Sequence, residues 1–375
     1  MTMAAKQIGS GIRRQRGVAL LIALVMLALA ATLASAMIWD ISLDEHRTAN
    51  LIQGDQAMQY ALGAEAWSEQ ILRRDIEKPQ TDQQAQQTQQ SGSGQNVNTS
   101  TSVNLTQDWA MHLPPLPVQG GVVNGQLQDL QGLFNLNNLV GVQVSPTAQG
   151  TAFTQFQRLL TALDIDPGIA NAVFDWVNPG DQPHVPGGAK DETYSRLQPA
   201  YLTAERPMTS ISELLLVAGV TPDIYRKLEP YVCVLPLVIN AQNSNQNQNQ
   251  NQDQGQSQIQ TGTGTTAAIT PTTINVNTAP PYVLMSLAPN IDLGTATALS
   301  QTLAAHPIEN PNDLATLWAQ LSGNQKLPTG TGVTSGYFRL TVKVQIGSTH
   351  LTMYSLLYRN QTGGTFAIRR TFGTL

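Results

Sequence analysis

One uninterrupted apolar run, VALLIALVMLALAATLASAMIW, extends from Val18 to Trp39 near the start of the chain. Twenty-two helical residues span roughly 33 Å, about the thickness of the hydrocarbon core of a bilayer. Arg13, Arg14 and Arg16 precede the run, which predicts that its start stays on the cytoplasmic side. The pattern therefore predicts one membrane-spanning helix, with the rest of the chain on the far side of the membrane.

Beyond Trp39 the apolar residues recur at intervals of three and four, as they do on one face of a helix. They are Leu51, Ile52, Met58, Ala61, Leu62, Ala66, Trp67, Ile71 and Leu72. One helix of roughly 55 residues is predicted, apolar in its first half and amphipathic in its second. Such a length without an early cap is typical of a helix that packs against other chains.

Two polar tracts interrupt the rest of the chain. Thr81–Ser102 and Ala241–Thr266 consist mostly of Gln, Asn, Ser, Thr and Gly. Because they have few apolar side chains to bury, both tracts are predicted to be disordered loops. An interaction segment is the alternative for either tract.

A helical period begins at Thr151, in FTQFQRLLTALDI. Its apolar face consists of Phe153, Phe156, Leu159, Leu160 and Leu163. PGIANAVFDWV predicts a second helix that Pro167 opens, and MTSISELLLVAGVTPDIYRKLEP predicts two more, separated at Gly219. An all-helical domain is therefore expected between Leu139 and about Pro236.

Alternation of apolar and polar residues predicts strands on both sides of this helical region. Trp109–Met111 and Gly121–Gln126 precede it. Near the end, YFRLTVKVQIG and STHLTMYSLLYRN predict a hairpin that turns at Gly347-Ser348, and AIRRTFGTL adds an edge strand or a tail. The apolar face of the first hairpin strand consists of Phe338, Leu340, Val342, Val344 and Ile346.

Two segments repeat one pattern, since Phe134–Asn137 and Ile274–Asn277 both read apolar-Asn-apolar-Asn. The second segment, with the Leu and Ala period after it, resembles helix-hairpin-helix DNA-binding proteins. Lys and Arg are absent between Ile274 and Gln325, and Asp292 lies in the turn that would face phosphate. We therefore favour a shared fold without DNA binding.

Composition and short motifs exclude several classes of function. A net charge of −5 and a pI near 5.5 argue against nucleic acid as the main partner. Cys233 is the one cysteine, so no intramolecular disulfide can form, and its apolar surroundings predict a small buried side chain. The sequence contains no Gly-rich phosphate loop, HExxH or G-x-S-x-G, so we expect no enzymatic activity.

One stretch, FDWVNPGDQPHVPGGAKDETY, gathers oxygen-bearing side chains in a chain with only 12% charged residues. They are Asp175, Asn178, Asp181, Asp191 and Glu192. Pro and Gly residues would fold the loop back on itself, which brings oxygen ligands together as a hard cation requires. A polar loop whose Asp side chains cap turns is the alternative. His184 is expected to be a loop residue, because Ca²⁺ prefers oxygen.

The leader has more than one interpretation. Ala34-Ser35-Ala36 fits the small-residue rule of signal peptidase, and an uncut anchor is a further alternative. However, the run exceeds an ordinary signal sequence in length, and the basic leader ends in Arg16-Gly17 directly before it.

A basic leader ending in Gly, a long apolar helix and an amphipathic continuation resemble type IV pilins and type II secretion pseudopilins. In that family a prepilin peptidase cuts after the Gly, so the resemblance implies cleavage after Gly17 and methylation of Val18. Most members carry Glu four residues beyond the new N-terminal residue, where this chain has Ile22. RGVALLIALVMLAL and the DLxGxFNLN pattern resemble the K branch of the minor pseudopilins, which lacks that Glu.

This resemblance implies an α+β fold, in which a long N-terminal helix packs on an antiparallel sheet and an all-helical, SAM-like domain is inserted. The implied segments are a leader at 1–17, the long helix at 18–75, a β part at 76–138, the helical domain at 139–240, a linker at 241–270, and a second helical segment with the hairpin at 271–375. Members of the branch are associated with calcium in the helical domain. The resemblance therefore implies a Ca²⁺ loop at Asp175, Asn178, Asp181, Asp191 and Glu192, although Lys190 stands where relatives often carry an acid.

The function implied is that of a minor pseudopilin at the tip of the type II secretion pseudopilus, which starts assembly and limits length. Its implied partners are minor pseudopilins I and J, other pseudopilins, the prepilin peptidase and the inner-membrane assembly platform. The N-terminus would be cytoplasmic and the C-terminal domain periplasmic, with no nucleic acid bound. An exported helix-hairpin-helix DNA-binding protein and a membrane-anchored binding module are the alternatives.

Overall fold

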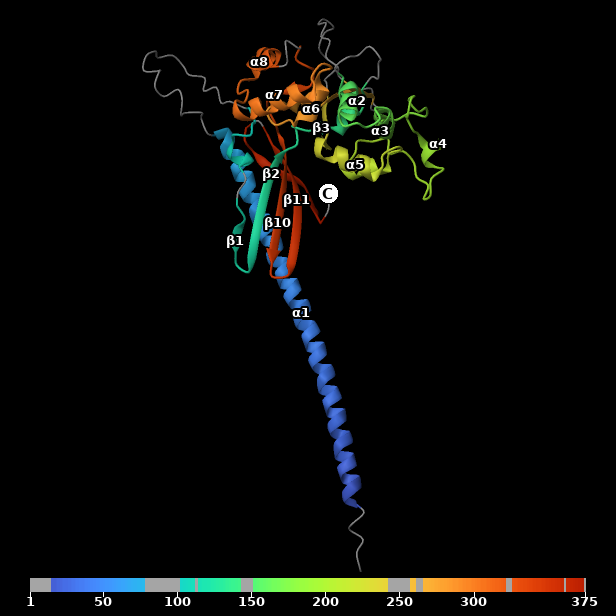
Figure 1. Cartoon of the computed structure of the whole chain (residues 1–375), viewed down its shortest axis with the longest axis vertical. Coiled ribbons are helices and arrows are strands. Elements are labelled where there is room, and N and C mark those ends of the chain that lie inside the picture. The colour runs from blue at the N-terminus through green and yellow to red at the C-terminus, as the bar shows by residue number, and fades with distance from the viewer. Residues whose placement is uncertain are drawn as a thin grey trace, which may run out of the picture.

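One helix runs most of the length of the molecule (Figure 1). The computed structural model describes residues 15–77, 102–111, 114–142, 151–241, 257–260, 266–321, 326–360 and 362–373. Helix α1, Gln15–Glu77, projects away from the other elements in its N-terminal half and lies against a β-sheet in its C-terminal half. We call residues 18–48, which are all exposed, the stalk, and the described residues from 49 onward the head.

The C-terminal half of α1 is held to the sheet by a stripe of small and apolar side chains. Ala57, Ala61, Ile71 and Leu72 are buried and share one core with the sheet. Ala61, Ile71 and Leu72 follow Ala57 by 4, 14 and 15 residues, close to one and four helical turns, so all four lie on one face of the helix. The amphipathic period seen in the sequence is therefore the face that contacts the sheet.

The sheet is antiparallel, with the strand order β1-β2-β10-β11-β12. The strands are β1 Leu116–Val118, β2 Gly121–Asp129, β10 Tyr337–Ile346, β11 Thr349–Arg359 and β12 Thr365–Phe372. The central strand β10 pairs with β2 from Phe338↔Asp129 to Ile346↔Gly121. Its alternate residues are buried towards α1, as its period of two predicts.

A helical region, residues 130–336, lies between the adjacent strands β2 and β10 and forms the broad end of the head (Figure 1). Its first half contains β3 Phe134–Asn135, 3₁₀ helix η2 Leu136–Leu139, α2 Ala152–Ala162, α3 Ile169–Val177, α4 Asp191–Tyr194, 3₁₀ helix η3 Ile211–Leu216, α5 Pro222–Leu228, 3₁₀ helix η4 Glu229–Tyr231 and β4 Val232–Cys233. Its second half contains β8 Ile274–Asn275, α6 Pro281–Leu287, α7 Leu293–Ala305, 3₁₀ helix η5 Pro311–Asp313, α8 Leu314–Leu321 and β9 Thr331–Gly332. Strands β5 Val238–Ala241, β7 Thr266–Thr270 and β6 Ser257–Gln260 form a small sheet between the halves.

Both halves of the helical region contribute to one hydrophobic core. Phe134, Phe156 and Leu160 from the first half share it with Leu284 and Trp318 from the second. Phe134 and Phe156 stack with their ring centroids 5.2 Å apart. Helix α2 packs directly against α6, so the halves bury their apolar faces on one another.

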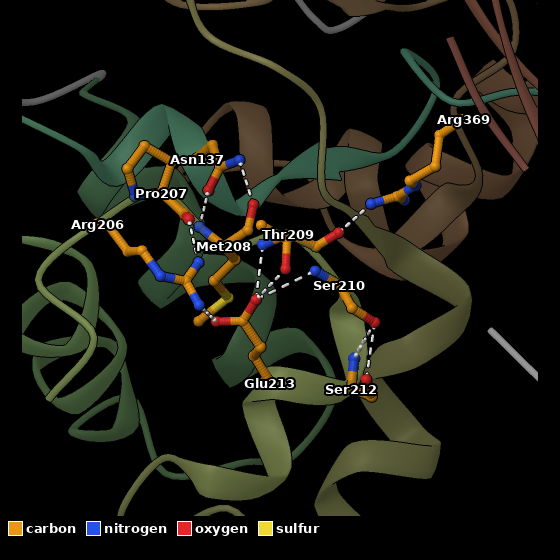
Figure 2. Close-up of polar contacts among 9 residues, drawn as sticks. All are labelled: Asn137, Arg206, Pro207, Met208, Thr209, Ser210, Ser212, Glu213 and Arg369. Atoms are coloured by element: carbon orange, nitrogen blue, oxygen red, sulfur yellow. Dashed lines mark hydrogen bonds and ion pairs between the residues drawn. The ribbon is translucent and has the colours of Figure 1, made fainter. Parts of the chain in front are cut away.

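The repeated asparagines have the same function in both halves. The Asn137 side chain donates to Met208 O (3.0 Å) and accepts from Met208 N (2.8 Å) (Figure 2). Asn277 makes the equivalent pair with Ile308 O (2.9 Å) and Ile308 N (2.9 Å). Each asparagine side chain thus satisfies the buried main-chain N–H and C=O of a residue that directly follows a proline, as a neighbouring strand would do. The sequence repeat is therefore a structural repeat.

A carboxylate fixes the segment that follows Met208. Glu213 Oε1 accepts from Thr209 N and Oγ1, both at 2.7 Å, and Glu213 Oε2 lies 3.6 Å from Arg206 Nη2 (Figure 2). Ser210 and Glu213 form a capping box at the start of η3. Burial raises the pKa of Glu213, but the hydrogen bonds from Thr209 and the charge of Arg206 outweigh it and hold the pKa below its usual value.

Most of the predicted architecture is confirmed. The long helix on an antiparallel sheet, the inserted helices and the hairpin turning at Gly347-Ser348 are all present. The predicted apolar faces of α2 and β10 are buried or pack against the core, and Cys233 is buried. AIRRTFGTL contributes most of the edge strand β12.

Three local predictions are wrong. Trp109–Met111 is not a strand, because Asp108–Ala110 forms the 3₁₀ helix η1, with Trp109 buried against Phe338. The first helix predicted in MTSISELLLVAGV is the 3₁₀ helix η3, since Val217 leaves the helical conformation. In the second polar tract, Ser257–Gln260 pairs with β7 as a strand. The disorder predicted for residues 81–101, 242–256 and 261–265 lies outside the described residues.

Replacing Asn137 with Ala should lower the free energy of unfolding by about 2–4 kcal/mol, because the N–H and C=O of Met208 lose their partners inside the core. Denaturant unfolding of the full chain in detergent measures this loss. Asn124→Ala, at an exposed position of β2, is the matched control and should change stability by less than about 0.5 kcal/mol. Equal effects of the two substitutions would contradict the proposed role of Asn137.

Replacing Glu213 with Gln should lower stability at neutral pH by about 1 kcal/mol, because the charge that strengthens the capping box is lost. The lowered pKa of Glu213 stabilises the fold above the unfolded pKa, and this contribution disappears as pH falls through the folded value. The difference between the two proteins should therefore shrink below about pH 4. Thermal unfolding across pH tests this, with the exposed Glu192→Gln as a control that shows no such trend.

Candidate functional site: the exposed apolar helix and the acidic loop

The stalk presents apolar side chains on every side. Val18, Ile22, Leu27 and Trp39 are each at least half exposed. The helix from Val18 to Ile76 is long and apolar enough to cross a membrane. None of the residues in its most apolar stretch is buried against the head. Gly17 and Val18, the predicted processing position, lie in the first turns of α1, and Ile22 lies one turn further on. The structure does not test the cleavage, which stays a prediction.

An ion pair between a buried carboxylate and a half-exposed guanidinium joins α1 to β12. Glu65, which is 4% exposed, accepts from Arg370 Nε at 2.8 and 2.9 Å and from Arg370 Nη2 at 2.6 Å. Ser355 on β11 donates to the same carboxylate. The hydrogen bonds that the Arg370 guanidinium donates to the Glu65 carboxylate, together with the charge of that carboxylate, raise the pKa of Arg370. A two-point contact of this kind fixes the rotation of α1 relative to β11 and β12.

An apolar groove of about 350 Å³ lies where α1 meets β1 and β2. Its lining includes Tyr60 and Trp67 of α1, Trp109 and Met111, and Leu116 of β1. Trp67 and Leu116 are about half exposed, so this surface continues the apolar character of the stalk into the head.

In the acidic loop, Asp175 and Asn178 are buried and bonded to protein groups. Asp175 accepts from the His184 main-chain N at 3.0 Å and lies 2.6 Å from His184 Nδ1. Asn178 Oδ1 accepts from Gly141 N at 2.6 Å, and its amide donates to Leu139 O and Phe174 O. Both side chains therefore hold neighbouring backbone in place.

Two of the other three predicted ligands contact separate partners, and the third is exposed. Asp191 Oδ1 accepts from Thr203 N at 2.8 Å, and this bond and that of the Thr203 hydroxyl lower the pKa of Asp191. Glu192 pairs with Arg196 on the surface, and Asp181 is exposed. The five side chains do not converge on one point.

The ammonium of Lys190 lies against two main-chain carbonyls of the loop. Its Nζ donates to Asp175 O at 2.8 Å and to Asn178 O at 2.6 Å. Across the described residues, no group of three or more His, Cys, Asp or Glu side chains could hold a metal ion. The predicted ligand set therefore does not fit one calcium ion in this structure. From the sequence, Lys190 could be recognised only as a departure from the relatives. A sequence pattern does not show that its ammonium contacts the carbonyls of this loop.

In the segment that resembles a DNA-binding hairpin, a carboxylate lies at the N-terminus of α7. Asp292 caps α7 and accepts from Thr295 N at 2.7 Å. The Asp292 carboxylate accepts the N–H group that would otherwise be free to bind a phosphate, and its negative charge would repel the phosphate. The arrangement agrees with the choice of a shared fold without DNA binding.

The fold and the exposed apolar helix define a membrane-anchored, pilin-like protein with a helical insertion. Two family models of type II secretion system protein K match residues 132–237 and 274–334. Type II secretion system protein K of Aeromonas hydrophila is 34% identical over 235 residues, covering 60% of this chain and 65% of that protein, which is less than two thirds of its length. The protein K of Pseudomonas aeruginosa is 28% identical over 370 residues, covering 96% and 94%.

Among solved structures, the crystal structure of the GspK-GspI-GspJ complex from the type 2 secretion system of enterotoxigenic Escherichia coli contains a chain of the same fold. Its TM-score is 0.59 at 22% identity, and the match covers 88% of this chain and 100% of that one. The protein K of Dickeya chrysanthemi is 32% identical over 263 residues, covering 60% of this chain and 67% of that protein. The chain therefore belongs to the type II secretion system protein K family.

Gly188→Ala should destabilise the loop, because a Cβ there would lie 2.2 Å from His184 O and 2.3 Å from Asp175 Oδ2. We expect a loss of about 2–3 kcal/mol, since both neighbours are fixed by hydrogen bonds. Thermal unfolding of the full chain measures it. At Gly125 nothing lies within 4 Å of an added Cβ, so Gly125→Ala is the control and should leave the unfolding temperature nearly unchanged.

Proposed function

We propose that this protein is a minor pseudopilin that occupies the tip of the type II secretion pseudopilus, where it starts assembly and limits length during export across the outer membrane. The observation that carries the proposal is the junction of the stalk to a broad head (Figure 1). A helix that is apolar all round needs lipid or other helices around it. A head with a large helical insertion fits the end of a fibre better than its repeating shaft.

The stalk has two environments in this proposal. Before assembly it crosses the inner membrane, with the N-terminus cytoplasmic and the head periplasmic, as the upstream arginines favour. A prepilin peptidase cuts after Gly17 and methylates Val18. After assembly, the stalk packs among the helices of other pseudopilins, beside the inner-membrane assembly platform.

Ile22 supports the tip position. The usual Glu at this position is explained by pairing with the N-terminal amine of the subunit ahead. A subunit at the tip has no subunit ahead of it, so an apolar side chain costs nothing there and suits the membrane better than a carboxylate.

The partners proposed for the tip are minor pseudopilins I and J, the counterparts of the two proteins in the complex that contains the structural relative. The groove that Trp67 and Leu116 line is one apolar surface available for packing between subunits. The proposed role is structural, and no catalytic step is assigned to the chain.

Pseudopilus length tests the proposal. When the amount of this protein is raised relative to the major pseudopilin, fibres should become shorter in electron micrographs, because more tips share the same pool of shaft subunits. An antibody to the head should label fibre ends. Labelling along the shaft, or a length that does not respond, would contradict the tip role.

Gly17→Val is the matched control, since a branched side chain at the cleavage position should block processing. Intact mass should show a methylated Val18 start for the unmodified protein and an uncut chain for the variant. The uncut variant should leave fibre length unchanged. A Met37 start would instead indicate signal peptidase.

A further inference from the structure

Lys190 lies at the centre of the acidic loop with its ammonium out of the solvent. The residue is 4% exposed, and its side chain is 5% exposed. A buried ammonium is costly unless oxygen atoms replace its water. The structure provides these oxygens.

Three oxygen atoms from two parts of the chain, the end of α3 and Glu205, lie near Nζ. The main-chain O of Asp175, at the end of α3, lies at 2.8 Å, and that of Asn178 at 2.6 Å. Glu205 Oε1 lies at 3.6 Å and provides the negative charge. Main-chain carbonyls and a carboxylate are the groups that a loop offers to a hard cation.

Glu205 is held in place for this contact. Its φ of 46° lies in the left-handed region, which few residues other than glycine adopt. Its main-chain N donates to Trp176 O at 2.9 Å, so the residue is tied to the same helix that supplies the Asp175 carbonyl. The loop before Lys190 and the segment around Glu205 are therefore joined through one ammonium.

An ammonium and a divalent ion cannot share this position. Two like charges a few ångströms apart in a low-dielectric site repel by several kcal/mol. Both oxygens of the Asp175 carboxylate already have a partner, because His184 contacts one through its ring and the other through its main-chain N.

We propose that the ammonium of Lys190 is the structural cation of this loop, so that residues 175–190 fold in this chain without a bound divalent ion. This inference concerns the loop alone and does not depend on the tip role. It differs from the calcium site that the family resemblance implies.

Hydrogen exchange of the full chain in detergent tests the proposal. The amides of residues 178–190 should exchange at the same rate in EDTA and in millimolar calcium chloride. In Lys190→Met the same amides should exchange at least about tenfold faster, because two carbonyls and Glu205 lose their partner. The amides of the sheet, residues 337–359, should be unchanged, which shows that the effect is local.

Lys343→Met is the matched control, since Lys343 is an exposed lysine of β10 and its loss should leave the loop as it is. If Lys190→Met does not fold, Glu205→Gln provides a milder change at a partly exposed side chain and should raise exchange in the same loop. Calcium-dependent protection of residues 178–190 in the unmodified protein would overturn the proposal. Unchanged loop exchange in both Lys190→Met and Glu205→Gln would also overturn it.

Discussion

The head depends on one constraint, which is that a helical region of about two hundred residues begins and ends at neighbouring strands. Because β2 and β10 pair side by side, residues 130–336 must leave and return at one point. Asp129 closes that point. Its buried carboxylate accepts from Gln131 N (2.8 Å), Ser335 Oγ (2.6 Å), Thr278 Oγ1 (2.7 Å) and Asn275 Nδ2 (2.9 Å). Burial raises the pKa of Asp129, and these hydrogen bonds oppose the rise by stabilising the charged form.

With its ends fixed, the helical region builds a core that is separate from the core between α1 and the sheet. Asn137 and Asn277, each with its pair of main-chain hydrogen bonds, then organise the two halves in the same way. Each follows a two-residue strand that pairs in parallel, β3 with β4 and β8 with β9. Phe134 and Ile274 lie at equivalent places in the two bridges and enter the same core. The helical region can therefore be large without altering the packing of α1 on the sheet.

Those parts of the fold could be predicted in which apolar residues recur at one regular spacing over many residues. Helix α1 and strand β10 have long, regular patterns, and their buried faces follow directly. Shorter elements depend on contacts that are distant in sequence, so Trp109 packs on Phe338 rather than joining a strand. The acidic loop shows the same limit, since composition identified Asp175 and Asn178 as a cluster but could not show that their side chains face His184 and Gly141. The position of Lys190 could not be predicted either, because its ammonium contacts the main-chain carbonyls of Asp175 and Asn178, which a sequence pattern does not place.

The stalk and the head share one continuous helix, since α1 continues without a break through the change from full exposure to burial near Ala57. Gly54 and Gly63 lie close to this transition, and each lowers local helix stability by about 1 kcal/mol relative to Ala. The helix is nevertheless continuous, and the Glu65 ion pair with Arg370 and the Arg359 guanidinium, which donates to Leu72 O (3.1 Å), hold its C-terminal half to the sheet. A displacement of the stalk along its axis must therefore move the head with it. This coupling is what a subunit needs if withdrawal from a membrane is to lift a folded domain.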